Sequence, residues 1–359
     1  MKIKPITTGQ AVMILMLTMG LMNHVIVLPS ILTVALRDSW ISVLFAGVIF
    51  FLWVPLVYFI IKKTNQEHLI GWLKENIHPI IAWIVKIILF GFILMNTFVT
   101  LYSTFTWVNS SYMSQTPKLV LIIPFMILCF FAAEAGIKTI AISAGILLPF
   151  VIIFGLFVMT VNIQYKDYSL LFPIFEHGFS PTLKGAIYLG GGLVEIFFLV
   201  LMQQYIRTKI KFKGIFLLSI FILAINFGPI TAAIAEFGPR QTAEFKYPAY
   251  TQWRLLTIGK YLNRLDFLSI YQWLSGAFVR ISISLFLLAD LFQIKSRKKN
   301  TVFLVCITIL FTIALFLPIN DPTFRTFLNK YYFQASLLCI VIITFFITVI
   351  TMFKKSVKI

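Results

Sequence analysis

The chain has 359 residues, of which 60% are hydrophobic and only 12% are charged, and its mean hydropathy is +0.96. These values exclude an ordinary soluble domain and indicate a polytopic membrane protein with one membrane domain. The net charge of +18 does not indicate a nucleic-acid partner, because the Lys and Arg residues fall in short clusters between apolar runs. The three cysteines, Cys129, Cys306 and Cys339, all lie within apolar runs, so no disulfide framework is expected.

Ten membrane helices are predicted, since a helix that crosses a bilayer needs about 20 apolar residues. The predicted ranges are 10–36, 40–61, 80–105, 119–133, 139–161, 183–206, 215–237, 267–292, 301–319 and 333–353. The first run is too long for the apolar core of a secretory signal, so it is kept as a membrane helix.

Three connecting segments have patterns of their own. Residues 66–77 mix Leu, Ile and Trp with charged residues, which is typical of an amphipathic helix in the membrane interface. Residues 162–182 and 238–266 are longer than simple turns, and the second loop is predicted to form a lid over the outer mouth of the bundle.

The distribution of basic residues predicts the orientation. With the N-terminus inside, the inner segments carry seventeen Lys and Arg residues and the outer segments carry eleven, most of them in the two long loops. Both termini are therefore predicted to be cytoplasmic.

The stretch from residue 20 to residue 35 cannot form one regular helix. Pro29 lacks a backbone N–H and clashes with the preceding turn, while Asn23 and His24 are polar near the middle of the span. In a bilayer, such a break persists only where it is buried in protein or lines a cavity. This stretch is predicted to form half of a binding site, the alternative being a simple packing kink.

A helix that restarts near Pro29 directs free N–H groups toward the midplane, where an amino-acid carboxylate could bind. The candidate ligand contacts at this break are Asn23, His24, Val25 and Ile26.

A second interruption is predicted five helices later. Gly190, Gly191 and Gly192 are the weakest helix-forming run in the chain and lie one residue pair before the mid-membrane Glu195. Unwound carbonyls of these glycines, with or without Glu195, are candidate acceptors for a ligand ammonium. Breaks in corresponding spans of two halves predict a five-plus-five inverted repeat with its site at the midplane.

Glu195 needs a partner or a proton at that depth, and Arg280 near the middle of helix eight is the natural partner. One hypothesis is that Arg280 supplies a fixed cation in place of a bound ion; the alternative is a purely structural pair. His24 is either a proton-linked switch or a neutral side chain that hydrogen-bonds to a neighbour.

Further polar side chains are candidates for the pocket wall, or else ordinary helix contacts. Asn96, Thr97, Thr100 and Ser103 share one face of helix three. Weaker candidates on helix eight are Ser282 and Ser284.

At these residues the chain resembles the B subunits of spore germinant receptors, the endospore germination permease family of the amino acid, polyamine and organocation transporter superfamily. The matching stretches are NHVIVLPSILTVALRDSW, LLFPIFEHGFSPTLKGA and YPAYTQWRLLTIGKYLNRLDFLSIYQWLSGAFVRIS. The third stretch is the most specific, through the order Tyr247-Pro248, Arg254, Gly259, Arg264-Leu265-Asp266 and Trp273.

The resemblance implies an all-α polytopic membrane protein with a LeuT-like fold and broken helices one and six. It also implies a location in the spore inner membrane, a larger A subunit and a C lipoprotein as partners, and a small nutrient such as an amino acid as ligand. Transporters of the superfamily usually have small residues at the first break. Asn23 and His24 stand there instead, which favours a sensor.

The sequence leaves two alternative functions. The first is a secondary amino-acid transporter, coupled to protons through Glu195 or His24. The second is an acyl-transferring enzyme with His24 as base, for which the sequence offers no catalytic partner. The nucleotide and metal motifs GxxxxGK[ST], HExxH and CxxC are absent from the sequence, so no catalytic residue, cofactor or metal is predicted.

Overall fold

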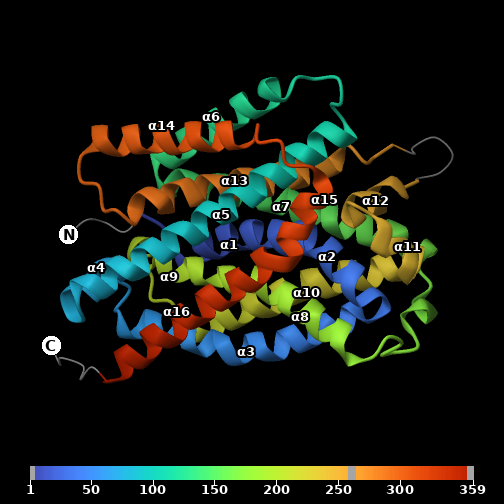
Figure 1. Cartoon of the computed structure of the whole chain (residues 1–359), viewed down its shortest axis with the longest axis horizontal. Coiled ribbons are helices and arrows are strands. Elements are labelled where there is room, and N and C mark those ends of the chain that lie inside the picture. Colours follow the sequence, from blue (N-terminus) through green and yellow to red (C-terminus); the bar gives the residue numbers. More distant parts are fainter. Residues whose placement is uncertain (1–4, 258–263, 354–359) are drawn as a thin grey trace.

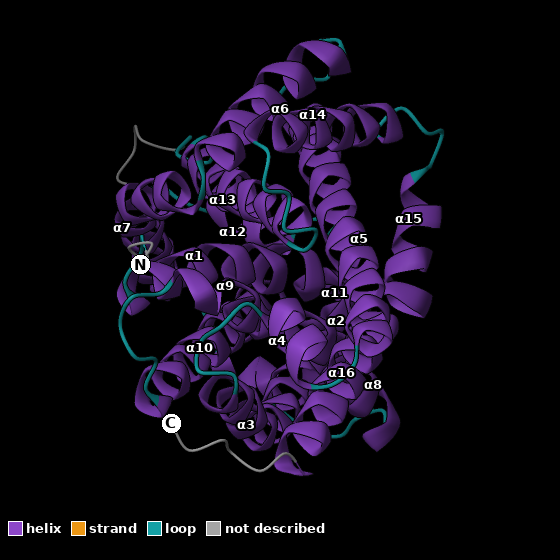
Figure 2. Ribbon diagram, turned by 90° about the vertical axis from the view of Figure 1, so that its left-hand side faces the viewer, coloured by secondary structure: helices purple, strands orange, loops and turns teal. Residues whose placement is uncertain are grey.

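The structure is a computed structural model that describes residues 5–257 and 264–353. The predictions that fall on residues 1–4, 258–263 and 354–359, including the basic residues of both termini and Gly259, lie outside the described residues. Within those described, regular structure is helical throughout, apart from one isolated bridge pair between Ile6 and Ile206 (Figure 2).

The first predicted helix is a composite of several segments. It consists of α1 (Thr8–Leu21), the π-helix η1 (Met22–Val27), α2 (Leu28–Ala35) and the short 3₁₀ turn η2 (Leu36–Asp38). A capping box starts α1, since the Gln10 N–H donates to the Thr7 hydroxyl at 3.3 Å and the Thr7 N–H donates to the Gln10 side chain at 2.9 Å.

The remaining helices follow in chain order, with most long helices running along one direction (Figure 1). They are α3 (Ser39–Lys63), α4 (Leu69–Asn76), α5 (Pro79–Ser111), α6 (Lys118–Ala135), α7 (Ile137–Val161), η3 (Asn162–Tyr165), η4 (Tyr168–Leu171), α8 (Phe179–Leu193), η5 (Val194–Phe197), α9 (Phe198–Met202), η6 (Gln203–Tyr205), α10 (Phe212–Phe237), α11 (Pro239–Glu244), α12 (Pro248–Arg254), α13 (Leu268–Asp290), α14 (Arg297–Ala314), α15 (Asp321–Phe327), η7 (Leu328–Tyr332) and α16 (Phe333–Phe353).

Eight helical stretches of the described chain are long and apolar enough to cross a membrane, so this is an integral membrane protein. The first stretch, Thr8–Lys63, contains both the composite first helix and α3. Arg297–Ala314 is not among the eight, and it begins with three basic residues. The count of ten crossings and the inverted repeat remain predictions.

The bundle has two different ends (Figure 1). The short helix α4 lies at one end, together with the last turns of α16, whereas α11, α12 and α15 lie at the other end. We call these the inner and outer ends, following the predicted orientation. The helix α4 buries Leu69, Ile70, Trp72 and Leu73 against the bundle and exposes Lys74 and Glu75.

The predicted break in helix one is an irregularity of a different kind. Leu21 and Leu28, which flank η1, both keep right-handed helical backbone angles, so the chain widens into a π-helix rather than unwinding. Pro29 follows at the second position of α2, and its missing N–H cannot continue the regular α-helical bonding. The expected unwound gap before Pro29 is therefore wrong, although the irregular segment lies where the sequence predicts it.

The predicted unwinding at Gly190–Gly192 is also wrong. The helix α8 runs through all three glycines, and the Gly190 and Gly192 carbonyls accept the Val194 N–H. The interruption comes just after them, where Val194–Phe197 tighten into the 3₁₀ segment η5 that carries Glu195.

The glycines serve close approach between helices. A Cβ on Gly191 meets the Phe333 backbone oxygen at 2.5 Å, and a Cβ on Gly192 meets the Asn23 side-chain oxygen at 2.2 Å. Because no side chain intervenes, α8 lies directly against η1 on one side and the start of α16 on the other.

Candidate ligand site

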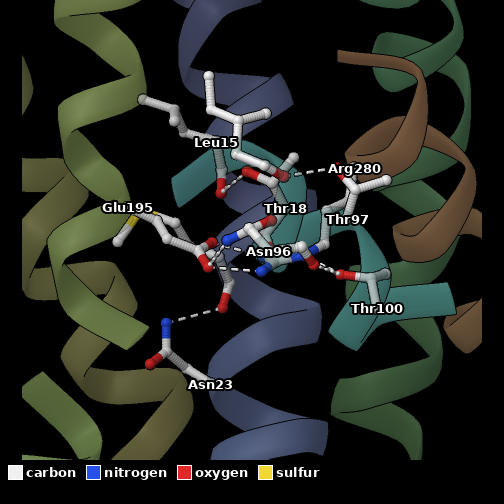
Figure 3. Close-up of polar contacts among 10 residues, drawn as sticks. Leu15, Thr18, Asn23, Asn96, Thr97, Thr100, Glu195 and Arg280 are labelled. Carbon is white, nitrogen blue, oxygen red and sulfur yellow. Dashed lines mark hydrogen bonds and ion pairs between the residues drawn. The ribbon is translucent and has the colours of Figure 1, made fainter. Parts of the chain in front are cut away.

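A buried ion pair lies at the centre of the bundle. The Arg280 guanidinium on α13 donates to both carboxylate oxygens of Glu195 on η5, with Nη2 2.5 Å from Oε1, and the two side chains are 0% and 1% exposed (Figure 3). This bidentate geometry is the strong form of an arginine–carboxylate contact.

Neighbouring helices form further hydrogen bonds to both members of the pair. Arg280 Nε donates to the Thr100 hydroxyl at 2.6 Å, and Nη1 donates to the Thr18 carbonyl of α1 at 2.8 Å. Asn96 Nδ2 donates to Glu195 Oε1 at 2.5 Å. Since desolvation of an ion pair is offset only when its other groups are also bonded, this network explains how both charges can lie at this depth.

The network joins four parts of the chain. Thr18 belongs to the first helix, Asn96 and Thr100 to α5, Glu195 to the irregular end of α8, and Arg280 to α13 (Figure 3). Asn23 lies one turn further along, where its Nδ2 donates to the Met19 carbonyl at 2.9 Å. Its Oδ1 is buried without a hydrogen-bond partner among the described residues.

A cavity of about 430 Å³ lies on the outer side of the bundle. Val25, Ile26 and Pro29 form one wall, so the irregular part of helix one borders it directly. The cavity is also lined by α5, Tyr188 of α8, the segment before α12, Trp273 of α13, and α15 with η7.

Several aromatic side chains shape this cavity. Trp273 stacks on the fully buried Trp107 with ring centroids 4.0 Å apart, and its indole N–H donates to Thr104 at 3.2 Å, so its ring is held in place. Tyr102 donates to the Ile319 carbonyl at 2.5 Å. Hydrogen bonds therefore hold the Trp273 and Tyr102 rings in place where they line the cavity.

Charged residues gather at the outer mouth. Lys246 forms an ion pair with Asp321 of α15 and lies 5.1 Å above the Tyr247 ring. Burial tends to lower the pKa of Lys246, but its hydrogen bond to Asp321, the interactions with Tyr247 and the charge of Asp321 together outweigh burial, and the pKa lies above the usual value. Burial raises the pKa of Tyr247, and Lys246 opposes that effect.

His24 lies in a second, smaller cavity of about 90 Å³. Val25 and Trp273 line both cavities and so form the wall between them. The His24 ring bonds to the backbone at Ile225, and its Nδ1 is buried without a partner within the described chain. Within the described chain, no hydrogen bond joins His24 to the Glu195–Arg280 network.

The remaining candidate ligand contacts are Thr97, Ser282 and Ser284, and none of them bonds to the Glu195–Arg280 pair in the described chain. The Thr97 hydroxyl is used within its own helix, donating to the Ile93 carbonyl at 2.7 Å. Ser282 lies on the side of α13 that faces Cys129 of α6, away from the pair, and Ser284 is buried. The Ser284 hydroxyl lacks a hydrogen-bond partner among the described residues.

Sequence reasoning missed most of the outer cavity. It did not single out Tyr102, Tyr188 or Lys246, nor any residue of α15 and η7. The motif Asn320-Asp321-Pro322 carried a signal, since an Asn cap followed by Pro predicts a helix start, and the Asn320 side chain does accept the Thr323 N–H at 2.8 Å.

The inner end of the bundle is held by a second polar cluster. Asp290, the last residue of α13, accepts hydrogen bonds from Tyr205 and from Gln204 (2.8 Å), and its Oδ2 lies 3.4 Å from His68 Nε2. Through its Nδ1, His68 also caps α4 by accepting the Gly71 N–H at 3.2 Å. These contacts tie α4, α13 and η6 together.

An integral membrane bundle in which an irregular first helix borders an outer cavity, above a buried charge pair, has the features of a permease-like protein. The chain belongs to the spore germination protein family, also called the spore permease family, whose model matches residues 5–323. The family membership inferred from the three matching stretches is thus confirmed.

Individual relatives agree with this assignment. The chain is 39% identical over 350 residues to spore germination protein XB of Bacillus anthracis, covering 97% of this chain and 98% of the relative. It is 23% identical over 290 residues to spore germination protein GerQB of Bacillus cereus, covering 78% of each chain. It is 21% identical to spore germination protein KB of Bacillus subtilis strain 168, covering 77% of this chain and 74% of that relative.

Proposed function

We propose that the chain is the transporter-like membrane subunit of a spore germinant receptor, which binds a small nutrient and signals to partner subunits to start germination. The observation that carries this proposal is the outer cavity of about 430 Å³ bordered by Val25 and Ile26. Small-molecule sites are usually cavities of roughly 300–1,000 Å³ with mostly apolar walls and a few polar groups. An amino acid fits within that volume.

A path for the signal is built into two segments. Trp273 of α13 lines the cavity seven residues before Arg280, and Tyr188 of α8 lines it seven residues before Glu195. A ligand that shifts either wall therefore acts on a helix that also carries one member of the buried pair. The stability of that pair makes the two segments respond together.

The wider assembly follows the family. We propose a larger A-type subunit and a C-type lipoprotein as partners, a location in the spore inner membrane, and cytoplasmic termini. A LeuT-like inverted repeat is also part of this proposal, since the irregular segments η1 and η5 fall in the two spans where such a repeat has its breaks.

The proposal is tested by binding of radiolabelled L-amino acids to the purified chain in nanodiscs. Thr106→Trp places a large ring in the cavity wall and is expected to weaken binding at least about tenfold. Thr160→Trp, on the exposed face of α7, is the matched control and should bind as the parent protein does. Equal binding by both variants would contradict the cavity as the site.

Uptake separates the receptor from the secondary transporter. The chain reconstituted alone in liposomes is expected to bind its ligand without accumulating it. Concentrative uptake of a labelled amino acid would instead support transport.

A further inference from the structure

The charges around the outer cavity are not balanced. Four charged side chains line it: Lys246, Asp321, Arg325 and Lys330. Lys246 and Asp321 neutralise each other. Arg325 and Lys330 form no ion pair and no side-chain hydrogen bond with any described residue, so the cavity has an excess of two positive charges.

We propose that this cavity selects small ligands that carry a carboxylate and rejects ligands of net positive charge. The inference rests on the proposed function, because it names the ligand class of the same cavity.

The cations differ in what they can contribute. Arg325 is partly buried, and its planar fork of N–H donors matches both oxygens of a carboxylate. Lys330 is exposed and acts as a point charge at the rim. Together they attract an anion toward the mouth and hold it there, while they repel an approaching cation.

The rest of the cavity suits the other parts of a small zwitterion. The Asn329 side-chain oxygen is buried without a hydrogen-bond partner in the described chain, and it lines the same cavity. It can accept from an ammonium group. Val25, Ile26 and Leu328 offer an apolar surface to an aliphatic side chain.

Thiol modification measures this charge preference without a known germinant. The reporter is Ser103→Cys on the α5 wall of the cavity, in a background in which Cys129, Cys306 and Cys339 are replaced by Ala. The purified chain in phosphatidylcholine nanodiscs is treated with an anionic or a cationic methanethiosulfonate reagent. The quantity compared is the ratio of the reaction rate with the anionic reagent to that with the cationic reagent. At low ionic strength, this ratio is expected to be about tenfold higher for the reporter cysteine than for a free thiol.

The variants assign the effect to the two cations. Arg325→Gln with Lys330→Gln is expected to abolish the preference. Lys184→Gln with Arg240→Gln removes the same charge from exposed positions outside the cavity and should leave the preference intact. Thr106→Cys provides a second reporter if Ser103→Cys does not yield a monodisperse protein.

Competing ligands identify the anion. Propionate is expected to slow modification at concentrations at which propionamide does not. Addition of anionic lipid to the nanodiscs tests the other source of negative charge. If anionic lipid abolishes the preference while propionate has no effect, a lipid headgroup occupies the site and the carboxylate proposal is overturned.

An anionic-to-cationic ratio equal to that of a free thiol also overturns the proposal. Failure of the proposed function looks different: the charge preference and the propionate effect persist, but no amino acid binds in the radioligand assay.

Discussion

Arg280 is a fully buried cation, so protein groups rather than bulk water must stabilise its charge. Its guanidinium bonds to a backbone carbonyl of helix one, a hydroxyl of α5 and both oxygens of Glu195. Contact with the Thr18 carbonyl is consistent with the hypothesis that Arg280 stands in for a bound ion, which we keep as a proposal.

Replacing one member of this pair should be much worse than replacing both. Arg280→Met leaves the Glu195 charge buried and unpaired, and we expect it to cost about 3–5 kcal/mol of stability. Glu195→Met combined with Arg280→Met removes both charges and should recover most of that loss. Thermal melting of the detergent-solubilised protein, followed by size-exclusion chromatography, measures the difference.

An exposed ion pair supplies the control for this experiment. Arg297 pairs with Glu134 at 3.2 Å, but its side chain is 88% exposed. Arg297→Met should therefore change stability by less than about 1 kcal/mol. If Arg280→Met melts at the same temperature as Arg297→Met, the pair does not stabilise the fold.

At the scale of single elements, α8 depends on the absence of side chains at its glycines. Gly191→Ala forces a Cβ against the Phe333 backbone, which cannot move without displacing α16, and we expect a loss of about 1–3 kcal/mol. Gly190→Ala meets only the tip of Leu337, at 3.1 Å, and should cost less. The same melting assay applies.

Gly91→Ala on α5 is the matched control, since a Cβ there has no neighbour within 4 Å. Alanine favours a helix over glycine by about 0.5–1 kcal/mol, so this variant should be as stable as the parent or more stable. A Gly191→Ala protein that melts like Gly91→Ala would contradict the close packing of α8 and α16.

At the scale of single elements, local sequence patterns predict where the long helices lie but not the type of irregularity within them. Apolar runs predict the long helices because length and hydropathy are properties of a local sequence. Pro29 and the glycine run mark the right neighbourhoods for irregular geometry, but they do not specify its type. Whether Gly191 is a hinge or a contact point depends on Phe333, which is distant in sequence and invisible to a local rule.

Part of the candidate site could also be predicted from the sequence. Glu195 and Arg280 could be matched because two isolated charges within a membrane require partners. The structure brings them together, and it adds Asn96 and Thr100 from the polar face of α5. The outer cavity could not be derived in this way, because Tyr102, Tyr188 and Asp321 come from three distant segments and only packing brings them together.

On the scale of the whole molecule, the same two segments meet at three levels. Tyr188 of α8 and Trp273 of α13 line the same cavity, Glu195 of η5 pairs with Arg280 of α13, and Tyr205 and Gln204 of η6 bond to Asp290 at the inner end. The outer end is hollow, whereas the inner end is tied to α4 through His68. We propose that the conformational signal of the receptor follows these contacts from the outer end to the inner end.

The outer cavity and the inner cluster are predicted to lie on opposite sides of the membrane, and α14 is the helix whose crossing is least evident from hydropathy. In a background with the three native cysteines replaced by Ala, we expect Thr323→Cys to react with an impermeant maleimide added outside intact cells. Ser296→Cys at the start of α14 should react only after permeabilisation, because the cluster of basic residues after it favours the cytoplasmic side. Both positions are exposed, so access to the reagent does not depend on packing. Labelling of both cysteines from the same side would mean that α14 does not cross the membrane, and it would reduce the ten predicted crossings.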